Sequence, residues 1–257
     1  MERPRVVMSV GASADGKVTL TRQQILMDQP SGKLWASLSP PPTDPVQEDF
    51  LETARRHYGC NAVLEGSGSL VNEGAEPPPL PVFTGDPSEM YTHHLPPDIT
   101  GQPSPPHMWF ITVDGRGRVR WTEDHQDWDV LVLVCRTTPA DYLAYLRRDR
   151  ICYLVAGDDR VVLVEAVGLL GTLLGITCVL STAGGGLIGA LVRADLIDEL
   201  SLTIAPALVG GFDTPSVLDG PSLAVGQEAT PLRLLAVHAD LGGSVRLHYQ
   251  VIRPDQP

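Results

Sequence analysis

The sequence predicts an α/β protein whose sheet is mixed but mostly parallel and ends in a C-terminal antiparallel hairpin. Three observations carry this prediction. Between residues 108 and 206, apolar runs alternate with helix-like segments. Two apolar runs of the chain lead into glycine-rich corners, at residues 66–70 and 184–186. Near the C-terminus, two strands in which apolar and polar residues alternate flank Gly242 and Gly243. Parallel strands need crossover connections, usually helices, so this alternation is typical of a parallel sheet with covered faces.

The first third of the chain begins with strand-like residues and one amphipathic helix. Residues 5–20 read as a strand, a turn at Asp15-Gly16 and a second extended segment. Residues 44–58 place apolar side chains at helical spacing after a capping aspartate and a proline at the first turn. The stretch "NAVLEGSGSL", residues 61–70, is an apolar strand that enters a Gly/Ser turn.

A proline-rich segment at residues 74–107 interrupts the pattern with ten prolines. Proline lacks an N–H group, so the segment excludes a continuous helix or an interior strand. We expect one domain over residues 1–257, with this segment as a long insertion loop. Its aromatic part, residues 82–95, is expected to form a partial lid over a cleft.

The remaining elements alternate regularly. The expected strands are residues 108–113, 128–135, 151–157, 176–181, 198–206, 231–241 and 244–252, and the expected helices are 137–148, 161–174 and 186–194. Residues 161–180 are also long enough to span a bilayer as one helix. Glu165, three glycines and the lack of flanking Lys/Arg clusters favour a short helix followed by a buried strand instead.

Composition narrows the possible partners. The net charge of −12 and the absence of a basic stripe argue against nucleic acid. The four cysteines, at positions 60, 135, 152 and 178, form no CxxC pair, so neither a metal site nor a disulfide framework is signalled. The first residues lack the pattern of a signal peptide. We therefore expect a cytoplasmic protein that acts on a small molecule.

The glycine corners are the strongest local sign of a binding site. Gly184, Gly185 and Gly186 separate an apolar strand from a helix-like stretch. A helix N-terminus at the carboxyl end of a strand offers unpaired N–H groups to an anion such as a pyrophosphate. Glycines also occur at such corners for turn geometry alone, and the corner by itself leaves both explanations open.

Three blocks of sequence resemble one known family. "RPRVVMSVGASADGKV" resembles an opening strand with the signature A-S-x-D-G-[KR], and "NAVLEGSGSLVNEGA" resembles V-G-[SV]-G-T-V-x-x-D-D-P. "STAGGGLIGALVRADLIDELSLTIAPALVGG" resembles E-G-G-x-x-L followed by L-[VI]-D-E-L and a proline. These blocks are similar to the reductase domain of riboflavin biosynthesis, which has a dihydrofolate-reductase-like fold and uses NADPH. The resemblance also implies a homodimer.

The resemblance assigns roles to particular positions. It implies that Gly11 and Ala12 border the nicotinamide and that Ser69 stands where the family has Thr. The implied cofactor-binding positions are Gly11, Ala12, Trp35, Gly66, Ser69, Gly115, Arg116, Gly184, Gly185, Gly186, Leu187 and Ile188. Arg116 or Arg118 would supply charge to the 2′-phosphate, with a solvated basic turn as the alternative.

The expected substrate side departs from the family pattern. The implied substrate positions are Ser37, Glu73 and Thr182. Thr182 replaces the family's Glu before the glycine corner, Glu73-Gly74-Ala75 replaces D-D-P, and the Arg that grips the ribose phosphate has no counterpart. Asp15 and Lys17 are the catalytic candidates: Asp15 would order the turn while Lys17 or a water serves the developing charge. A purely structural role of Asp15 in the Asp-Gly turn is the alternative.

These residues lead to one expected function and two alternatives. The resemblance implies NADPH-dependent hydride transfer to a C=N or C=O carbon of a pyrimidine or sugar-amine substrate, as in 5-amino-6-(5-phosphoribosylamino)uracil reductase. Loss of the Glu and Arg favours a divergent reductase of secondary metabolism with a non-phosphorylated substrate. The third hypothesis is a scaffold that binds a nucleotide without turnover.

Overall fold

A computed structural model describes residues 3–25, 30–38, 55–100, 108–121, 128–240 and 242–253. The chain divides into two compact units, which are treated separately below. The first unit comprises Met1–Pro4 and Cys60–Val179, and the second comprises Arg5–Gly59 and Leu180–Pro257. The expectation of one domain over residues 1–257 remains a prediction.

The first unit is built on four parallel strands. They are β2 (Ala62–Gly66), β3 (Met108–Val113), β4 (Trp128–Val134) and β5 (Cys152–Val155), paired in that order. Leu64, Ile111, Leu133 and Leu154 are fully buried. Strands covered on both faces read as nearly continuous apolar runs, which is why the sequence identifies them.

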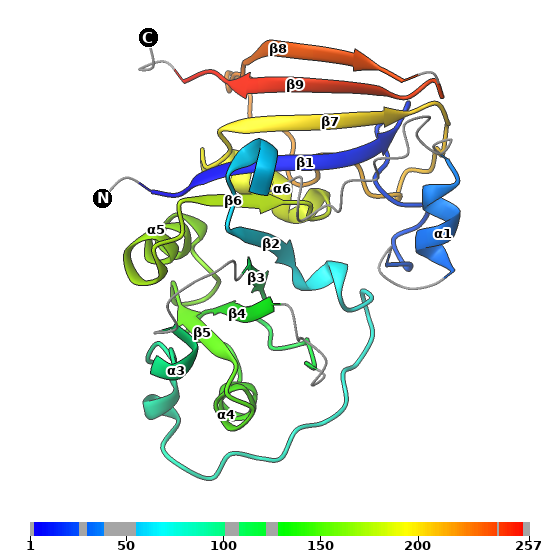
Figure 1. The fold of residues 1–257 in the computed structure, drawn as a ribbon. Helices are drawn as coiled ribbons and strands as arrows, with labels where there is room; N and C mark the ends of the chain where they lie inside the picture. Colours follow the sequence, from blue (N-terminus) through cyan, green and yellow to red (C-terminus); the bar gives the residue numbers. More distant parts are fainter. Residues whose placement is uncertain are drawn as a thin grey trace. The chain divides into compact units, whose positions relative to one another are not determined.

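Two longer helices follow these strands along the chain. In α4 (Ala140–Arg148), Tyr142, Leu143 and Leu146 are buried, and Figure 1 shows the helix beside β5. The next helix, α5 (Leu163–Leu174), ends at Gly175 in the left-handed conformation, with φ of 63°. Residues 161–180 thus form a helix that is followed by β6 (Cys178–Ser181). Within the described ranges, the structure holds no helix with the length and apolarity that a membrane span requires.

The described part of the proline-rich segment covers a sheet edge, and its expected role as a partial lid remains a prediction. Its backbone pairs with β5 in both directions, His94 N to Tyr153 O at 2.9 Å and Tyr153 N to His94 O at 3.0 Å. The Tyr91 hydroxyl donates to Thr138 O at 3.0 Å. The segment also contains the short helices η2 (Pro87–Met90) and α3 (Pro97–Thr100). Covering β5 in this way removes an exposed edge of unpaired backbone groups.

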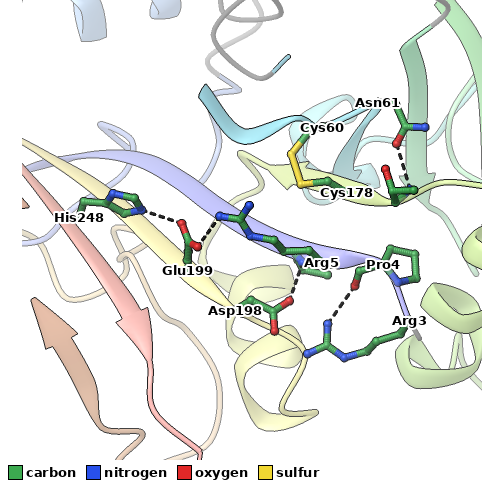
Figure 2. Close-up of a disulfide and its surroundings, with 11 residues drawn as sticks. Arg3, Pro4, Arg5, Cys60, Asn61, Cys178, Asp198, Glu199 and His248 are labelled. Carbon is green, nitrogen blue, oxygen red and sulfur yellow. Dashed lines mark hydrogen bonds and ion pairs between the residues drawn. A yellow bond between two sulfur atoms is a disulfide. The ribbon is translucent and has the colours of Figure 1, made fainter. Parts of the chain in front are cut away.

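A disulfide joins Cys60 to Cys178 in the first unit, contrary to the expectation of no disulfide (Figure 2). The backbone beside it is hydrogen-bonded as well, because Asn61 N donates to Cys178 O at 3.2 Å and Thr177 N donates to Asn61 Oδ1 at 3.2 Å. The two cysteines are 118 residues apart, so no local sequence pattern predicts the disulfide. Cys135 and Cys152 are buried free thiols.

Reduction of this disulfide should lower the free energy of unfolding by about 2–5 kcal/mol, since the bond closes a long loop in the unfolded chain. Urea denaturation with and without dithiothreitol measures the difference. The Cys60→Ala/Cys178→Ala variant serves as the control, because its transition should not respond to the reductant. Thiol titration would first establish that the disulfide is fully reduced. If the urea midpoint of the reduced wild type then equals that of the oxidised protein, the expectation is contradicted.

The second unit carries the mixed part of the fold. Figure 1 shows β1 (Arg5–Ser13), β7 (Glu199–Ala205), β9 (Val245–Val251) and β8 (Leu232–Ala239) side by side in that order. β1 and β7 are parallel, whereas β9 is antiparallel to both β7 and β8. The helices α1 (Ser31–Ala36) and α6 (Gly185–Arg193) belong to this unit. The predicted α/β class, with mostly parallel strands and a C-terminal hairpin, is confirmed.

Charged contacts fix the amino-terminal ends of β1 and β7. Asp198 accepts a hydrogen bond from Val6 N at 2.7 Å, and Glu199 pairs with Arg5 and with His248, the latter at 2.8 Å (Figure 2). These residues lie at the end of the strands opposite the glycine corner. We therefore infer that these contacts align the two strands, and we expect the ligand site at the carboxyl ends of the strands.

Candidate functional site

In the second unit, the carboxyl ends of β1 and β7 lie next to each other. Gly11 pairs with Thr203 and Ala12 with Ile204 in the parallel register. Gly11 is exposed, and a β-carbon built on it would meet no atom within 4 Å, whereas Ala12 is buried. Ligands of α/β sheets bind outside the carboxyl ends of parallel strands, so Gly11 lies where such a ligand can approach the backbone.

The three glycines of the α6 corner have different roles. Gly184 is the extended N-cap of α6 and makes no side-chain cap hydrogen bond. Gly184 and Gly186 are exposed, and β-carbons on them would meet nothing within 4 Å. A β-carbon on buried Gly185 would collide with Ser216 O. Two of the three positions therefore leave space for a ligand, and the middle one allows the chain to pack on itself.

The segment that packs on α6 is held by several bonds. Asp219 N donates to Gly185 O at 3.0 Å, Val18 N donates to Pro215 O at 3.0 Å, and Ser216 Oγ donates to Asp219 Oδ1 at 2.7 Å. One turn along α6, a β-carbon on Gly189 would collide with Asp219 O. These contacts explain why positions 185 and 189 are occupied by glycine without any ligand being involved.

The two remaining residues of the predicted pyrophosphate loop differ in how far their side chains are buried. Leu187 is half-buried, and Ile188 is fully buried in the core. Contact between Ile188 and a ligand at the corner would therefore involve its backbone.

Asp15 is an anchor for the loop that follows β7. Its carboxylate accepts hydrogen bonds from Ser13 Oγ at 2.7 Å, Val209 N at 3.0 Å and Gly210 N at 2.7 Å. The hydroxyl of Ser13, followed by the two backbone amides, lowers the pKa of Asp15 to about 2. An acid with this pKa holds almost no proton at neutral pH. These contacts favour the turn-ordering role over proton donation.

Lys17, the second catalytic candidate, contacts the same region. Its Nζ donates to Thr214 O at 3.1 Å. Its backbone forms an isolated antiparallel bridge with Ser216. The structure thus places Asp15 and Lys17 together, on the loops flanking the carboxyl ends of β1 and β7, and their role in catalysis remains a prediction.

The Asp15→Asn variant should be less stable than wild type at neutral pH, and this difference should shrink as the pH falls from about 4 toward 2. A carboxyl whose pKa is lowered from 3.8 to about 2 stabilises the fold above its unfolded-state pKa and loses that contribution on protonation. Urea denaturation between pH 7 and pH 3 measures the difference. Asp213→Asn, in an exposed position of the same unit, is the control. A wild-type advantage that does not decline with pH would contradict this assignment.

The other candidates of the second unit lie on α1 and after β6. Trp35 is half-buried, and Ser37 is the exposed C-cap residue of α1, where its Oγ donates to Leu34 O at 2.7 Å. Thr182 is half-buried between buried Ser181 and Ala183. The structure places all three in the unit that holds the α6 corner.

In the first unit, β2 ends in a Gly/Ser turn that contains η1 (Ser67–Ser69). Ser69 Oγ donates to Glu65 Oε2 at 2.8 Å, and the Glu65 side chain is buried at 5% exposure. The sequence-based site did not include Glu65. A signal was present, because a carboxylate interrupts an apolar strand where the family motif V-G-[SV]-G-T begins with Val. Glu73, the predicted substrate position, is exposed beyond this turn.

The turn after β3 is organised by Asp114. Its buried carboxylate accepts hydrogen bonds from Arg118 N and Val119 N, both at 2.8 Å. A β-carbon on Gly115 would lie 3.3 Å from Cys135 Sγ, so this glycine permits close packing. Arg116 is exposed, whereas the Arg118 guanidinium donates to the carbonyl oxygens of residues 71 and 72. Arg116 is therefore better placed than Arg118 to meet a phosphate.

Across the part of the chain that the structure describes, no cluster of three or more His, Cys, Asp or Glu side chains could hold a metal ion. In the proline-rich segment, His93 Nδ1 accepts a hydrogen bond from Val155 N at 3.1 Å.

An exposed glycine corner at the start of a helix, in an α/β protein with parallel strands, defines a candidate nucleotide-binding protein. Comparison with known protein families narrows this class of protein to a single family. The model of the RibD C-terminal domain matches residues 4–243, and the chain belongs to this family. The family resemblance seen in the sequence is thereby confirmed, and the chain is an oxidoreductase.

Individual relatives agree with this assignment. The chain is 27% identical over 222 residues to the 2,5-diamino-6-ribosylamino-4(3H)-pyrimidinone 5′-phosphate reductase of Archaeoglobus fulgidus, covering 86% of this chain and 88% of the relative. A pyrimidine reductase-like protein from Corynebacterium diphtheriae has a TM-score of 0.59 at 16% identity, with 97% and 92% of the two chains covered. The riboflavin biosynthesis reductase of Saccharomyces cerevisiae has a TM-score of 0.56 at 15% identity, with 97% and 90% covered. These two structures support the fold.

Proposed function

We propose that this chain is an NADPH-dependent reductase of riboflavin biosynthesis. It transfers a hydride to a C=N or C=O carbon of a pyrimidine that carries a ribosylamine phosphate, the substrate class named for the Archaeoglobus relative. The observation that carries the proposal is the pair of exposed glycines, Gly184 and Gly186, at the uncapped start of α6. Unpaired N–H groups and open space at that point fit the pyrophosphate of a dinucleotide.

The remaining cofactor contacts follow from the candidate positions. In the second unit, Gly11 and Ala12 would border the nicotinamide, Trp35 would lie by the cofactor, and residues 184–188 would hold the pyrophosphate. In the first unit, the implied contacts are Gly66, Ser69, Gly115 and Arg116. Exposed Arg116 would pair with the 2′-phosphate that distinguishes NADPH from NADH, because a guanidinium binds phosphate through paired hydrogen bonds.

When bound, NADPH supplies the hydride, and the protein contributes position and electrostatics. Asp15 keeps the loop after β7 in place through Val209 and Gly210. Because its pKa is about 2, we assign the proton for the developing negative charge to Lys17 or to a water rather than to Asp15. Ser37, Glu73 and Thr182 remain the proposed substrate contacts.

The phosphate group of the substrate distinguishes the proposed riboflavin-pathway reductase from the alternative, a divergent reductase with a non-phosphorylated substrate. Thr182 in place of the family's Glu, and the missing Arg, favour a substrate without the phosphate. We would therefore follow NADPH oxidation with 2,5-diamino-6-ribosylamino-4(3H)-pyrimidinone 5′-phosphate and with its dephosphorylated form. A preference for the phosphorylated compound supports the riboflavin-pathway reaction. A preference for the other compound supports the divergent reductase, and stoichiometric NADPH binding without oxidation supports the non-catalytic scaffold.

The protein is further proposed to be a homodimer that uses β8. All eight residues of β8 are exposed, among them Leu234 and Val237 at 51% and 57%. A long apolar edge strand is rarely left uncovered, and a second copy can pair with it symmetrically. Light scattering should find a dimer for wild type and a monomer for Leu234→Lys/Val237→Lys. Val164→Lys, which changes a similarly exposed valine on α5, should leave the dimer intact.

The cytoplasm is the proposed location of this biosynthetic enzyme. The Cys60–Cys178 pair is the observation against it, because disulfides persist mainly in oxidising surroundings. Thiol labelling of these two cysteines in intact cells would show whether the pair is reduced there.

A further inference from the structure

Two histidines of the proline-rich segment hold it against the edge of β5 in the first unit. His94 makes both backbone hydrogen bonds of an antiparallel bridge with Tyr153, at 2.9 and 3.0 Å. The His93 ring accepts a hydrogen bond through Nδ1 from Val155 N at 3.1 Å. His93 and His94 thus form a histidine pair that bonds three backbone groups of β5, groups that an uncovered edge strand would present to another chain.

The contact made by His93 requires an unprotonated Nδ1. In the neutral ring one nitrogen donates and the other accepts, whereas both nitrogens of the charged ring donate. Val155 N is itself a donor, so a proton on Nδ1 would face a second N–H group and the hydrogen bond would be lost. The His93 side chain is exposed, so solvent protons reach it freely.

The His94 ring lies where a positive charge is unfavourable. Its Nε2 is buried and has no hydrogen-bond partner among the residues that the structure describes. The ring packs on Tyr153 with the two centroids 5.5 Å apart, and the Arg147 guanidinium lies 5.7 Å from the centroid of the same tyrosine. Burial, followed by the charges of Arg147 and Arg150, lowers the pKa of His94. The neutral ring is therefore the form that fits this position.

The other titratable groups on the elements around His94 do not reverse this preference. On α3, Asp98 is paired with Arg150. On η2, Glu89 is exposed to solvent, which screens its charge. On β5, burial raises the pKa of the Tyr153 phenol, which is therefore neutral in mildly acidic solution. Both rings of the histidine pair thus hold the segment on β5 in their neutral form.

We propose that the histidine pair is a pH-sensitive fastener: protonation of its two rings in mildly acidic solution releases residues 93–95 from β5 and opens the strand edge. The change is local, because other anchors of the segment involve neither histidine. Phe83 N donates to Asp141 Oδ1 at 2.6 Å, and the Tyr91 hydroxyl donates to Thr138 O at 3.0 Å. The segment is thus a cover that is closed at neutral pH and partly open in acid, and this device is independent of the proposed reductase activity.

Acid opens the cover because the open segment binds protons more readily than the closed one. A histidine whose pKa is lowered in the closed state stabilises that state above its ordinary value of 6.5, and this contribution is lost as the pH falls through the lowered pKa. Protonation of His93 acts in the same direction, since it removes the bond from Val155 N. The opening is therefore expected below pH 6.5.

Amide hydrogen exchange followed by NMR measures the opening directly. The reporters are Tyr153 N and Val155 N, because they donate to His94 O and to the His93 ring. After correction for the intrinsic pH dependence of exchange, the protection of both amides should fall about tenfold or more between pH 7.5 and pH 5. The amide of Ile111, in the interior strand β3, is the control and should change less than about twofold.

His93→Asn and His94→Phe are the matched variants. The asparagine Oδ1 can accept from Val155 N as the histidine Nδ1 does, but it does not take up a proton in this pH range. Phenylalanine keeps an aromatic ring against Tyr153 and has no group to protonate. The double variant should therefore keep both reporter amides protected at pH 5, and each single variant should remove part of the pH effect.

Each of three results would overturn the proposal. The first is wild-type protection of the reporter amides that is the same at pH 5 and pH 7.5. The second is a double variant that opens in acid as wild type does. If the double variant does not fold, the NMR titration of the His93 and His94 rings in wild type decides: a loss of protection whose midpoint differs from the titration of both rings is the third. Failure to bind NADPH would overturn the reductase proposal and leave these readouts unaffected.

Discussion

Gly186→Asp should lower the affinity for NADPH on the order of 100-fold or more and leave the unbound protein as stable as wild type. Position 186 lies in the first turn of α6, where it is exposed and its β-carbon would meet no neighbour. An aspartate in the first turn interacts favourably with the helix dipole, so stability should not fall. The same carboxylate would repel a pyrophosphate at the N-terminus of α6 and compete for its N–H groups.

Calorimetric titration with NADPH and thermal unfolding of the unbound protein measure the two effects. Gly186→Ala is the matched control, because it adds a β-carbon without charge and should retain most of the affinity. An aspartate variant that binds NADPH like wild type would place the pyrophosphate elsewhere. A variant that loses both binding and stability would show that Gly186 is required for the fold.

Gly185→Ala and Gly189→Ala should each destabilise the protein by about 3 kcal/mol or more, with or without cofactor. Both glycines are buried, and their β-carbons would collide with the carbonyl oxygens of Ser216 and Asp219. Relief of the collision requires the 215–219 segment to leave α6, which breaks the bond from Asp219 N to Gly185 O.

Urea denaturation of the unbound variants measures this destabilisation. Gly186→Ala provides the comparison again, because alanine in an exposed helical position should stabilise by about 0.5–1 kcal/mol relative to glycine. If Gly185→Ala unfolds at the wild-type urea concentration, the packing of residues 215–219 on α6 is not the reason for that glycine.

The sequence predicted the structure best where a local residue pattern is compatible with only one type of secondary structure. β3, β4 and β5 are apolar because both faces of a parallel sheet are covered. Gly175 ends α5 because a left-handed residue is needed there. The family motifs located the carboxyl ends of β1 and β2, and the start of α6, since these blocks contain the glycines that form the corners.

Features set by contacts between distant residues could not be predicted. The Cys60–Cys178 bond joins positions 118 residues apart. The need for glycine at position 185 depends on Ser216, which lies far along the chain. The prolines of residues 74–107 correctly excluded long regular elements, but the pairing of His94 with Tyr153 along the edge of β5 has no local signature.

Transfer of deuterium from NADPH deuterated at the nicotinamide C4 tests the central claim most directly. Wild-type protein would be incubated with this cofactor and with 2,5-diamino-6-ribosylamino-4(3H)-pyrimidinone 5′-phosphate, and the product would be analysed by mass spectrometry. We expect one deuterium in the reduced product when the label is on one face of the nicotinamide C4, and none when the label is on the opposite face. NADPH binding without deuterium in either the phosphorylated or the dephosphorylated compound would contradict hydride transfer and favour a non-catalytic scaffold.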